Sequence, residues 1–237
     1  MLVRDDETSW LAIGQPAHAW LAGQIARHWA PALSPDAVLA VEQHDVAWVD
    51  WDRRPPLHAP ARRAAAFFEA PADQRLAIWR DAPLKLVEQS PYAALLVSLH
   101  ARNVHTRYGD PAQRPPEVET LLADQQALQD DLLRRTGASR VDAERDGDLL
   151  FALDALSLTL CHGWGGRDLP PTAEATLHLE PAGGEAWTLD PWPLDVPELT
   201  VGLAARRFTE RFDDEAALHA ALDAAPFVAL RWTLRPA

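Results

Sequence analysis

The pattern of apolar residues changes at Gly166, and this change constrains the fold of the chain more than any other feature. Before Gly166, apolar residues recur at the spacing of amphipathic helices. After it, short segments of alternating apolar and polar residues are separated by proline and glycine. We therefore predict a helical body over residues 1–166 and a β-rich region over residues 167–237 that packs on it.

The helical body is expected to contain about six helices. Proline at a first-turn position and Ser34 at an N-cap position mark two of the helix starts, and Pro83 is expected to kink or split a third helix. The predicted helices cover residues 16–29, 36–48, 72–89, 92–108, 117–135 and 143–164. The proline-rich segment 53–71 is predicted to be a surface loop.

Strands are predicted mainly in the C-terminal region, with one short helix among them. The strands are predicted over residues 172–181, 185–195, 198–208 and 227–236, and the helix over 213–226. Residues 1–4 and 10–14 form a predicted hairpin that could join this sheet. The fold class that follows is mainly α: a helical bundle with a β-rich C-terminal sheet.

Composition argues against several classes of partner. The net charge of −13, from 22 basic and 35 acidic residues, disfavours nucleic acid or an anionic membrane surface as the main partner. No apolar run approaches the roughly 20 residues of a membrane helix, and the acidic start does not resemble a signal peptide. Cys161 is the only cysteine, so no intrachain disulfide is possible. We expect a cytoplasmic protein with a small-molecule substrate; the sequence leaves the oligomeric state open.

Several histidine and aspartate residues lie inside the predicted apolar helices. They are His18, His44, Asp45, His100 and Asp154. Burying such groups costs free energy unless they are paired. Each could be satisfied separately, a histidine by a backbone carbonyl and an aspartate by a helix N-terminus or an arginine. A divalent metal ion would satisfy them together, and imidazole with carboxylate suits Mn, Fe, Zn or Ni without distinguishing among them.

The order of these residues resembles a known superfamily. Neighbouring residues of a helix point about 100° apart, so His44 and Asp45 would need ligands from other helices to share one ion. The order His18, His44-Asp45, Asp154 on successive helices resembles the HD-domain superfamily of metal-dependent phosphohydrolases. That resemblance implies an HD-like helical bundle in which these four residues bind the metal.

A second resemblance covers nearly the whole chain. The segments "QPAHAWLAGQIARHW", "VEQHDVAWVDWD", "PYAALLVSLHA" and "LDALSLTLCHGW" resemble an uncharacterised bacterial family with a domain of unknown function, related to the HD group. This family implies no established reaction.

The chain also departs from the HD pattern. Many HD phosphohydrolases carry a glycine and a lysine shortly after the His-Asp pair, where this chain has Ala47 and Trp48. Phosphate contacts would then come from arginine, and the candidates are Arg53, Arg54, Arg102 and Arg107. His100 is expected near the site, while His105 is left open as a ligand of a second ion. Trp48 and Trp51 are interpreted as packing residues, with stacking on a substrate ring as the alternative.

Three functions remain as hypotheses. The first is a metal-dependent hydrolase of a small phosphorylated or nucleotide-like molecule, in which Asp45 orients a water molecule and His100 donates a proton or holds a second ion. The second is a di-iron oxygenase of HD-like fold, which needs ligands for two ions. The third is a non-catalytic protein that binds a metal or another ligand.

Overall fold

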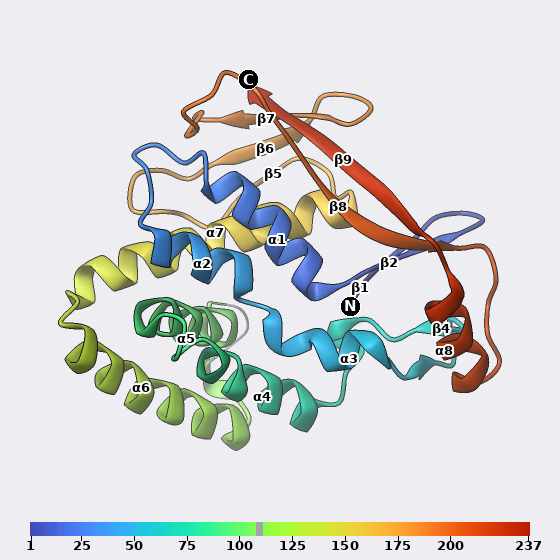
Figure 1. The fold of residues 1–237 in the computed structure, drawn as a ribbon, viewed down its shortest axis with the longest axis horizontal. Helices are drawn as coiled ribbons and strands as arrows, with labels where there is room; N and C mark the ends of the chain where they lie inside the picture. The colour runs from blue at the N-terminus through green and yellow to red at the C-terminus, as the bar shows by residue number, and fades with distance from the viewer. Residues whose placement is uncertain (108–110) are drawn as a thin grey trace.

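The computed structural model describes residues 1–107 and 111–237. A seven-stranded sheet forms one side of the molecule (Figure 1), with strand order β1-β2-β8-β9-β7-β6-β5. Its strands are β1 (Leu2–Asp5), β2 (Trp10–Ile13), β5 (Arg167–Asp168), β6 (His178–Pro181), β7 (Ala186–Asp190), β8 (Leu199–Phe208) and β9 (Phe227–Pro236). The sheet is mixed, because β7 and β9 run parallel while the other neighbouring strands are antiparallel.

The two longest strands, β8 and β9, form the centre of the sheet. They pair from Leu199↔Leu234 to Arg206↔Phe227. Alternate residues of β8 are buried, as expected for a sheet with one face on a core. The N-terminal hairpin joins this sheet, since Trp10 of β2 pairs with Phe208 of β8.

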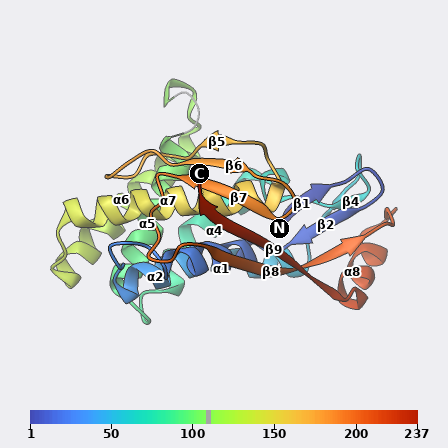
Figure 2. The same cartoon turned by 90° about the horizontal axis from the view of Figure 1, so that it is seen from above.

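The helices pack beside this sheet and against one another. They are α1 (Gln15–Ala26), α2 (Pro35–Gln43), α3 (Val49–Arg53), α4 (Ala72–Asp81), α5 (Pro91–Thr106), α6 (Pro116–Thr136), α7 (Arg140–His162) and α8 (Glu215–Ala224). Helices α4, α5 and α6 lie on the side away from β7 and β9 in Figure 1, and Figure 2 shows α6 and α8 at opposite ends of the molecule. Ser34, Ser90 and Ser139 cap helix N-termini through their side chains, and left-handed Gly137 and Gly163 end α6 and α7.

One hydrophobic core joins the helices to the sheet. It contains Leu21 of α1 and Leu156 of α7 together with Leu179 of β6 and Leu203 of β8. The buried face of the sheet therefore packs directly on the helices that carry the candidate site residues. The division of the chain at residue 166 stays a prediction.

The prediction of a mainly α, HD-like bundle is wrong. The N-terminal hairpin and the C-terminal strands assemble into one seven-stranded mixed sheet, which is too large a part of the structure for such a bundle. The physical reason is that the apolar faces of β2, β8 and β9 complete the core that the helices leave open. The fold is therefore a combination of helices with a large mixed sheet.

Several local predictions also need correction. The helix predicted over 36–48 ends at Gln43, and a 3₁₀ turn (Val46–Trp48) follows. The segment 53–71 is not merely a surface loop, because it forms a small hairpin, β3 (Leu57–His58) and β4 (Arg63–Ala64), and buries Ala64–Ala66. The helix predicted over 72–89 is split at Pro83, as expected: α4 ends at Asp81, and a 3₁₀ turn (Pro83–Lys85) follows.

Two further segments are shorter than predicted. The helix predicted over 92–108 ends at Thr106, and Tyr108 lies outside the described residues. Only residues 178–181 of the strand predicted over 172–181 are extended in the sheet. In the part of the chain that the structure describes, no helix has both the length and the hydropathy needed to cross a lipid bilayer.

Candidate metal centre

The five histidine and aspartate residues singled out by the sequence come from three helices and from the end of a fourth, and they lie together in the interior. His18 lies on α1, His100 on α5 and Asp154 on α7. His44 caps the C-terminal end of α2, and Asp45 follows it. All five are buried, with His18 and His44 fully inaccessible and Asp154 only 7% exposed.

The prediction that His44 and Asp45 lie in the middle of a helix is wrong. Helix α2 ends at Gln43, and Asp45 has φ −109° and ψ 18°, outside the helical region. The 100° separation expected in a continuous helix therefore does not apply. Both side chains can face the same interior space, which removes the geometric difficulty that the sequence raised.

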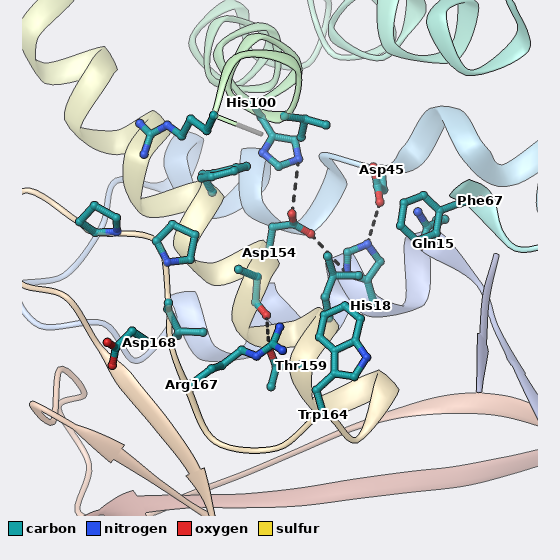
Figure 3. A pocket seen from close by; sticks show the side chains of 18 of the residues that line it. Gln15, His18, Asp45, Phe67, His100, Asp154, Thr159, Trp164, Arg167 and Asp168 are labelled. Atoms are coloured by element: carbon teal, nitrogen blue, oxygen red, sulfur yellow. Dashed lines mark hydrogen bonds and ion pairs between the residues drawn. The ribbon is translucent and has the colours of Figure 1, made fainter. Parts of the chain in front are cut away.

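Short distances connect these side chains. The potential ligand atoms of His18, His44 and Asp154 all lie within 4.8 Å of one another. His18 Nε2 lies 2.7 Å from Asp45 Oδ2, and His44 Nε2 lies 3.3 Å from Asp154 Oδ1. His100 Nε2 is 3.9 Å from the other oxygen, Asp154 Oδ2. Asp45 thus borders the three-residue group through His18, and His100 borders it through Asp154 (Figure 3).

Hydrogen bonds on the far side of His18 fix its tautomer. The Ser157 hydroxyl donates its single hydrogen to the backbone carbonyl of Asp154 at 2.9 Å. It therefore accepts from His18 Nδ1, which lies 2.9 Å away. In neutral His18 the other nitrogen, Nε2, then carries no hydrogen, and its lone pair faces the carboxylate of Asp45. Two acceptors in contact need a cation or a proton between them.

In neutral His44, as in His18, Nδ1 donates a hydrogen bond and Nε2 is left with a lone pair. Its Nδ1 donates to the backbone carbonyl of Val41 at 2.8 Å, since a carbonyl can only accept. Its Nε2 is buried and makes no hydrogen bond of acceptable geometry, although Asp154 is near. Asp45 Oδ1 is also buried without a partner. The lone pairs and carboxylates therefore suit a bound cation, and the buried His18–His44–Asp154 cluster could hold a metal ion.

The electrostatics of the cluster show how strongly these groups interact. Burial alone would lower the pKa of His44, but the carboxylates of Asp45 and Asp154 outweigh it and raise the pKa to about 9. Burial would raise the pKa of Asp154, but the surrounding histidines, led by His44, lower it to about 2. Burial lowers the pKa of His100 to about 4. Without a bound cation the cluster thus contains a His44 imidazolium paired with Asp154 beside a neutral His100, and a metal ion would take the place of the proton on His44 Nε2.

A pocket of about 790 Å³ opens onto this cluster. His18, Asp45, His100 and Asp154 line one part of it, as Figure 3 shows. The other walls are largely apolar and include Phe67, Trp79, Val104, Phe151 and Leu158. Arg107 and Arg167 also line the pocket, so it combines a polar base, apolar walls and positive side chains.

The arginines proposed from the sequence lie in different places. Among the four candidates, Arg107 is the one that lines this pocket, and it is paired with Asp148. Arg54 binds Asp223 and Arg102 binds Glu144. Arg53 lines a separate, smaller cavity.

The remaining candidates from the sequence lie outside the cluster. His105 Nδ1 contacts the backbone carbonyl of Ala101 at 2.8 Å, and His105 is not among the residues that line the pocket. Trp48 and Trp51 pack in an aromatic cluster with Trp79 rather than against the pocket. Cys161 is a buried free cysteine, as the sequence indicated.

Sequence reasoning missed three important residues. Ser157 was not recognised as a site residue because a serine in a helix is not unusual. It lies three residues after Asp154 and so on the same face of α7. Trp79 and Arg167 line the pocket from α4 and β5, and no pattern in the sequence connects these segments with the histidines. Only the tertiary fold brings them together.

Comparison with known proteins identifies a family but no characterised relative. Residues 1–210 match the family described as "Protein of unknown function (DUF3891)". Searches of curated proteins and of solved structures found no significant match. The resemblance to the HD superfamily therefore stays a prediction. Because the match spans residues 1–210 of 237, the chain belongs to the DUF3891 family.

Proposed function

We propose that the protein is a metal-dependent hydrolase of a small phosphorylated molecule. The observation that carries the proposal is the convergence of His18, His44 and Asp154, two of which, His18 and Asp154, line a large pocket. Three protein ligands leave coordination positions open, as in catalytic rather than structural metal sites. The pocket gives a small molecule access to that position. The proposal rests on this site and not on an HD-type fold.

The chain's own residues would hold and orient the reacting groups. A metal ion in such a site polarises a phosphoryl oxygen and lowers the pKa of a bound water molecule. Asp45, whose Oδ1 has no partner, is placed to orient the attacking water and accept its proton. His100 lines the pocket beside Asp154, and we assign it a contact with the leaving group. The apolar walls exclude bulk water from the reacting bond.

Metal content and phosphoesterase activity test the proposal together. Protein purified without a histidine tag and reconstituted in turn with Mn, Fe, Zn and Ni is expected to retain about one ion per chain and to hydrolyse p-nitrophenyl phosphate. Asp154→Asn is expected to lose both properties. Asp142→Asn, at an exposed position on the same helix and away from the pocket, is the matched control. Less than about 0.1 equivalent of every metal would contradict the proposal.

One observation favours a second candidate, a di-iron oxygenase. The two oxygens of Asp154 face different histidines, Oδ1 towards His44 and Oδ2 towards His100. A carboxylate in this position is placed to bridge two ions. Two iron atoms per chain with uptake of dioxygen would favour the oxygenase, whereas one ion with phosphoesterase activity would favour the hydrolase. One ion without either activity would indicate a binding protein.

A further inference from the structure

Arg167 differs in its surroundings from the other arginine of the pocket. Arg107 is paired with Asp148, so its charge is balanced. Arg167 lies exposed on β5, the edge strand of the sheet, and makes no ion pair with any residue in the ranges 1–107 and 111–237. The adjacent carboxylate, Asp168, is held by His178 at 2.7 Å. Arg167 therefore presents to the pocket a positive charge that no ion pair within the described residues balances, beside Asp168, which also lines the pocket and is paired with His178.

Aromatic stacking fixes the position of this charge. The guanidinium of Arg167 lies over the ring of Trp164, 4.6 Å from its centre. Trp164 in turn stacks on His162, with ring centres 4.4 Å apart and planes inclined by 5°. A guanidinium stacked in this way keeps its N–H edge free for a ligand. Figure 3 places Arg167 beside Trp164 and on the opposite side of the pocket from His100.

Apolar side chains make up much of the wall of the pocket that Arg167 shares with the metal-binding cluster. Phe151, Leu158 and Val104 are among them. A molecule that fills the pocket therefore meets a polar base, apolar walls and a cation. Each of these environments selects a different part of the ligand.

We propose that the substrate of this site is an amphipathic molecule with an apolar body, whose end remote from the reacting bond carries a second anionic group that binds Arg167. This inference rests on the proposed function only in calling the molecule a substrate. The second anion could be a carboxylate or a phosphonate-like group, since a stacked guanidinium binds either.

Binding of non-reacting probes to the metal-free protein tests the inference. Butanoate, octanoate, octylphosphonate and octanol are titrated in the presence of EDTA and followed by calorimetry and by the fluorescence of the pocket residues Trp79 and Trp164. One octanoate is expected to bind per chain, more tightly than octanol. Affinity should rise by about threefold to fourfold per added methylene from butanoate to octanoate. Comparison of octanoate with octylphosphonate shows which anion the site prefers.

Substitution of Arg167 separates the anion contact from the apolar contact. Arg167→Gln, at an exposed position that does not threaten folding, is expected to weaken octanoate binding by roughly fivefold and to leave octanol binding unchanged. Arg231→Gln is the matched control, because Arg231 is exposed on β9 and does not line the pocket.

Three outcomes would overturn the inference: no binding of any probe, equal affinity for octanoate and octanol, or equal loss in the two variants. Because EDTA removes any metal, these outcomes are independent of the hydrolase assay. The proposed function can fail while the amphipathic site stands, and the reverse also holds.

Discussion

At the scale of single residues, Ser157 determines which nitrogen of His18 is available to a metal. Its hydroxyl accepts from His18 Nδ1 and donates to the backbone carbonyl of Asp154, so it attaches the proposed ligand His18 to helix α7 in one orientation. We expect Ser157→Ala to weaken metal binding by about tenfold or more, because groups that orient ligands have effects of this size. Competition with a chromophoric chelator measures the affinity. Thr159→Ala, which also removes a hydroxyl from α7, should leave it unchanged.

His44 is expected to stabilise the metal-free fold through its charge. Its imidazolium is buried beside the carboxylates of Asp45 and Asp154. His44→Gln leaves these carboxylates buried without their cation, so the free energy of unfolding in EDTA should fall by roughly 3 kcal/mol. Asp154→Asn should then cost less in the His44→Gln background than in the wild type, with a coupling of about 1 kcal/mol or more. Additive effects in urea denaturation would contradict this pairing.

The residues of the cluster could be found from the sequence because each interrupts an apolar segment. Burying His18, His100 or Asp154 without a partner costs free energy, so their positions in apolar segments identified them as candidates without a structure. Their common location depends on the meeting of α1, α5 and α7, which no local pattern encodes. Arg167 is the clearest example of a pocket residue that the sequence could not predict, because nothing in the sequence of an arginine after two glycines indicates a pocket.

At the scale of elements, an ion pair connects α5 with α7, the helices of His100 and Asp154. Arg102 donates from its two terminal guanidinium nitrogens, Nη1 and Nη2, to the carboxylate of Glu144, at 2.8 and 2.5 Å. The hydrogen bonds from Arg102 lower the pKa of Glu144 below its usual value. The ionised form of Glu144 is therefore favoured in the folded chain, and its contribution to stability is present at neutral pH and lost in acid.

This pair predicts a specific pH dependence for Glu144→Gln. The variant should be less stable than the wild type above about pH 5, and the difference should shrink as the pH falls through the lowered pKa of Glu144. Urea denaturation from pH 3 to 7 gives the difference at each pH. Glu198→Gln is the control, since Glu198 is exposed and makes no ion pair with a described residue. A difference that is constant with pH would show that the ion pair does not stabilise the fold.

Most elements could be predicted from periodicity, but their ends and partners could not. Strands β8 and β9 match the predicted segments closely, because alternation, glycine and proline define them. The end of α2 at Gln43 was missed, since the apolar pattern runs on through Val46 and Trp48 in the following turn. A 3₁₀ turn that continues the burial of a helix looks like the same helix in sequence.

At the scale of the whole molecule, the fold class was mispredicted because the sheet is built from both ends of the chain. Trp10 of β2 and Phe208 of β8 are neighbours in the sheet although about 200 residues separate them. Each strand can be identified from its own sequence. The large mixed sheet that these strands form, and the core that it shares with the helices, depend on this long-range pairing.

The shared core predicts that the helices and the sheet unfold together. Leu234 of β9 is fully buried in the core cluster that also contains Leu156 of α7. Leu234→Ala should therefore lower the stability of the helices, by about 2–5 kcal/mol, although it lies in the sheet. Circular dichroism at 222 nm, which reports mainly on helices, measures this effect during urea denaturation. The control is Phe227→Ala on the same strand, at a side chain that is 64% exposed, with an expected change within about 0.5 kcal/mol.

The two possible results assign different roles to the sheet. If the 222 nm transition of Leu234→Ala shifts as a single cooperative step, the sheet is part of the folding unit that holds the histidine cluster in place. Substitutions in β8 and β9 would then weaken metal binding without touching a ligand. If the transition is unchanged while probes of the sheet shift, the region after residue 166 folds separately, and the one-core description is wrong.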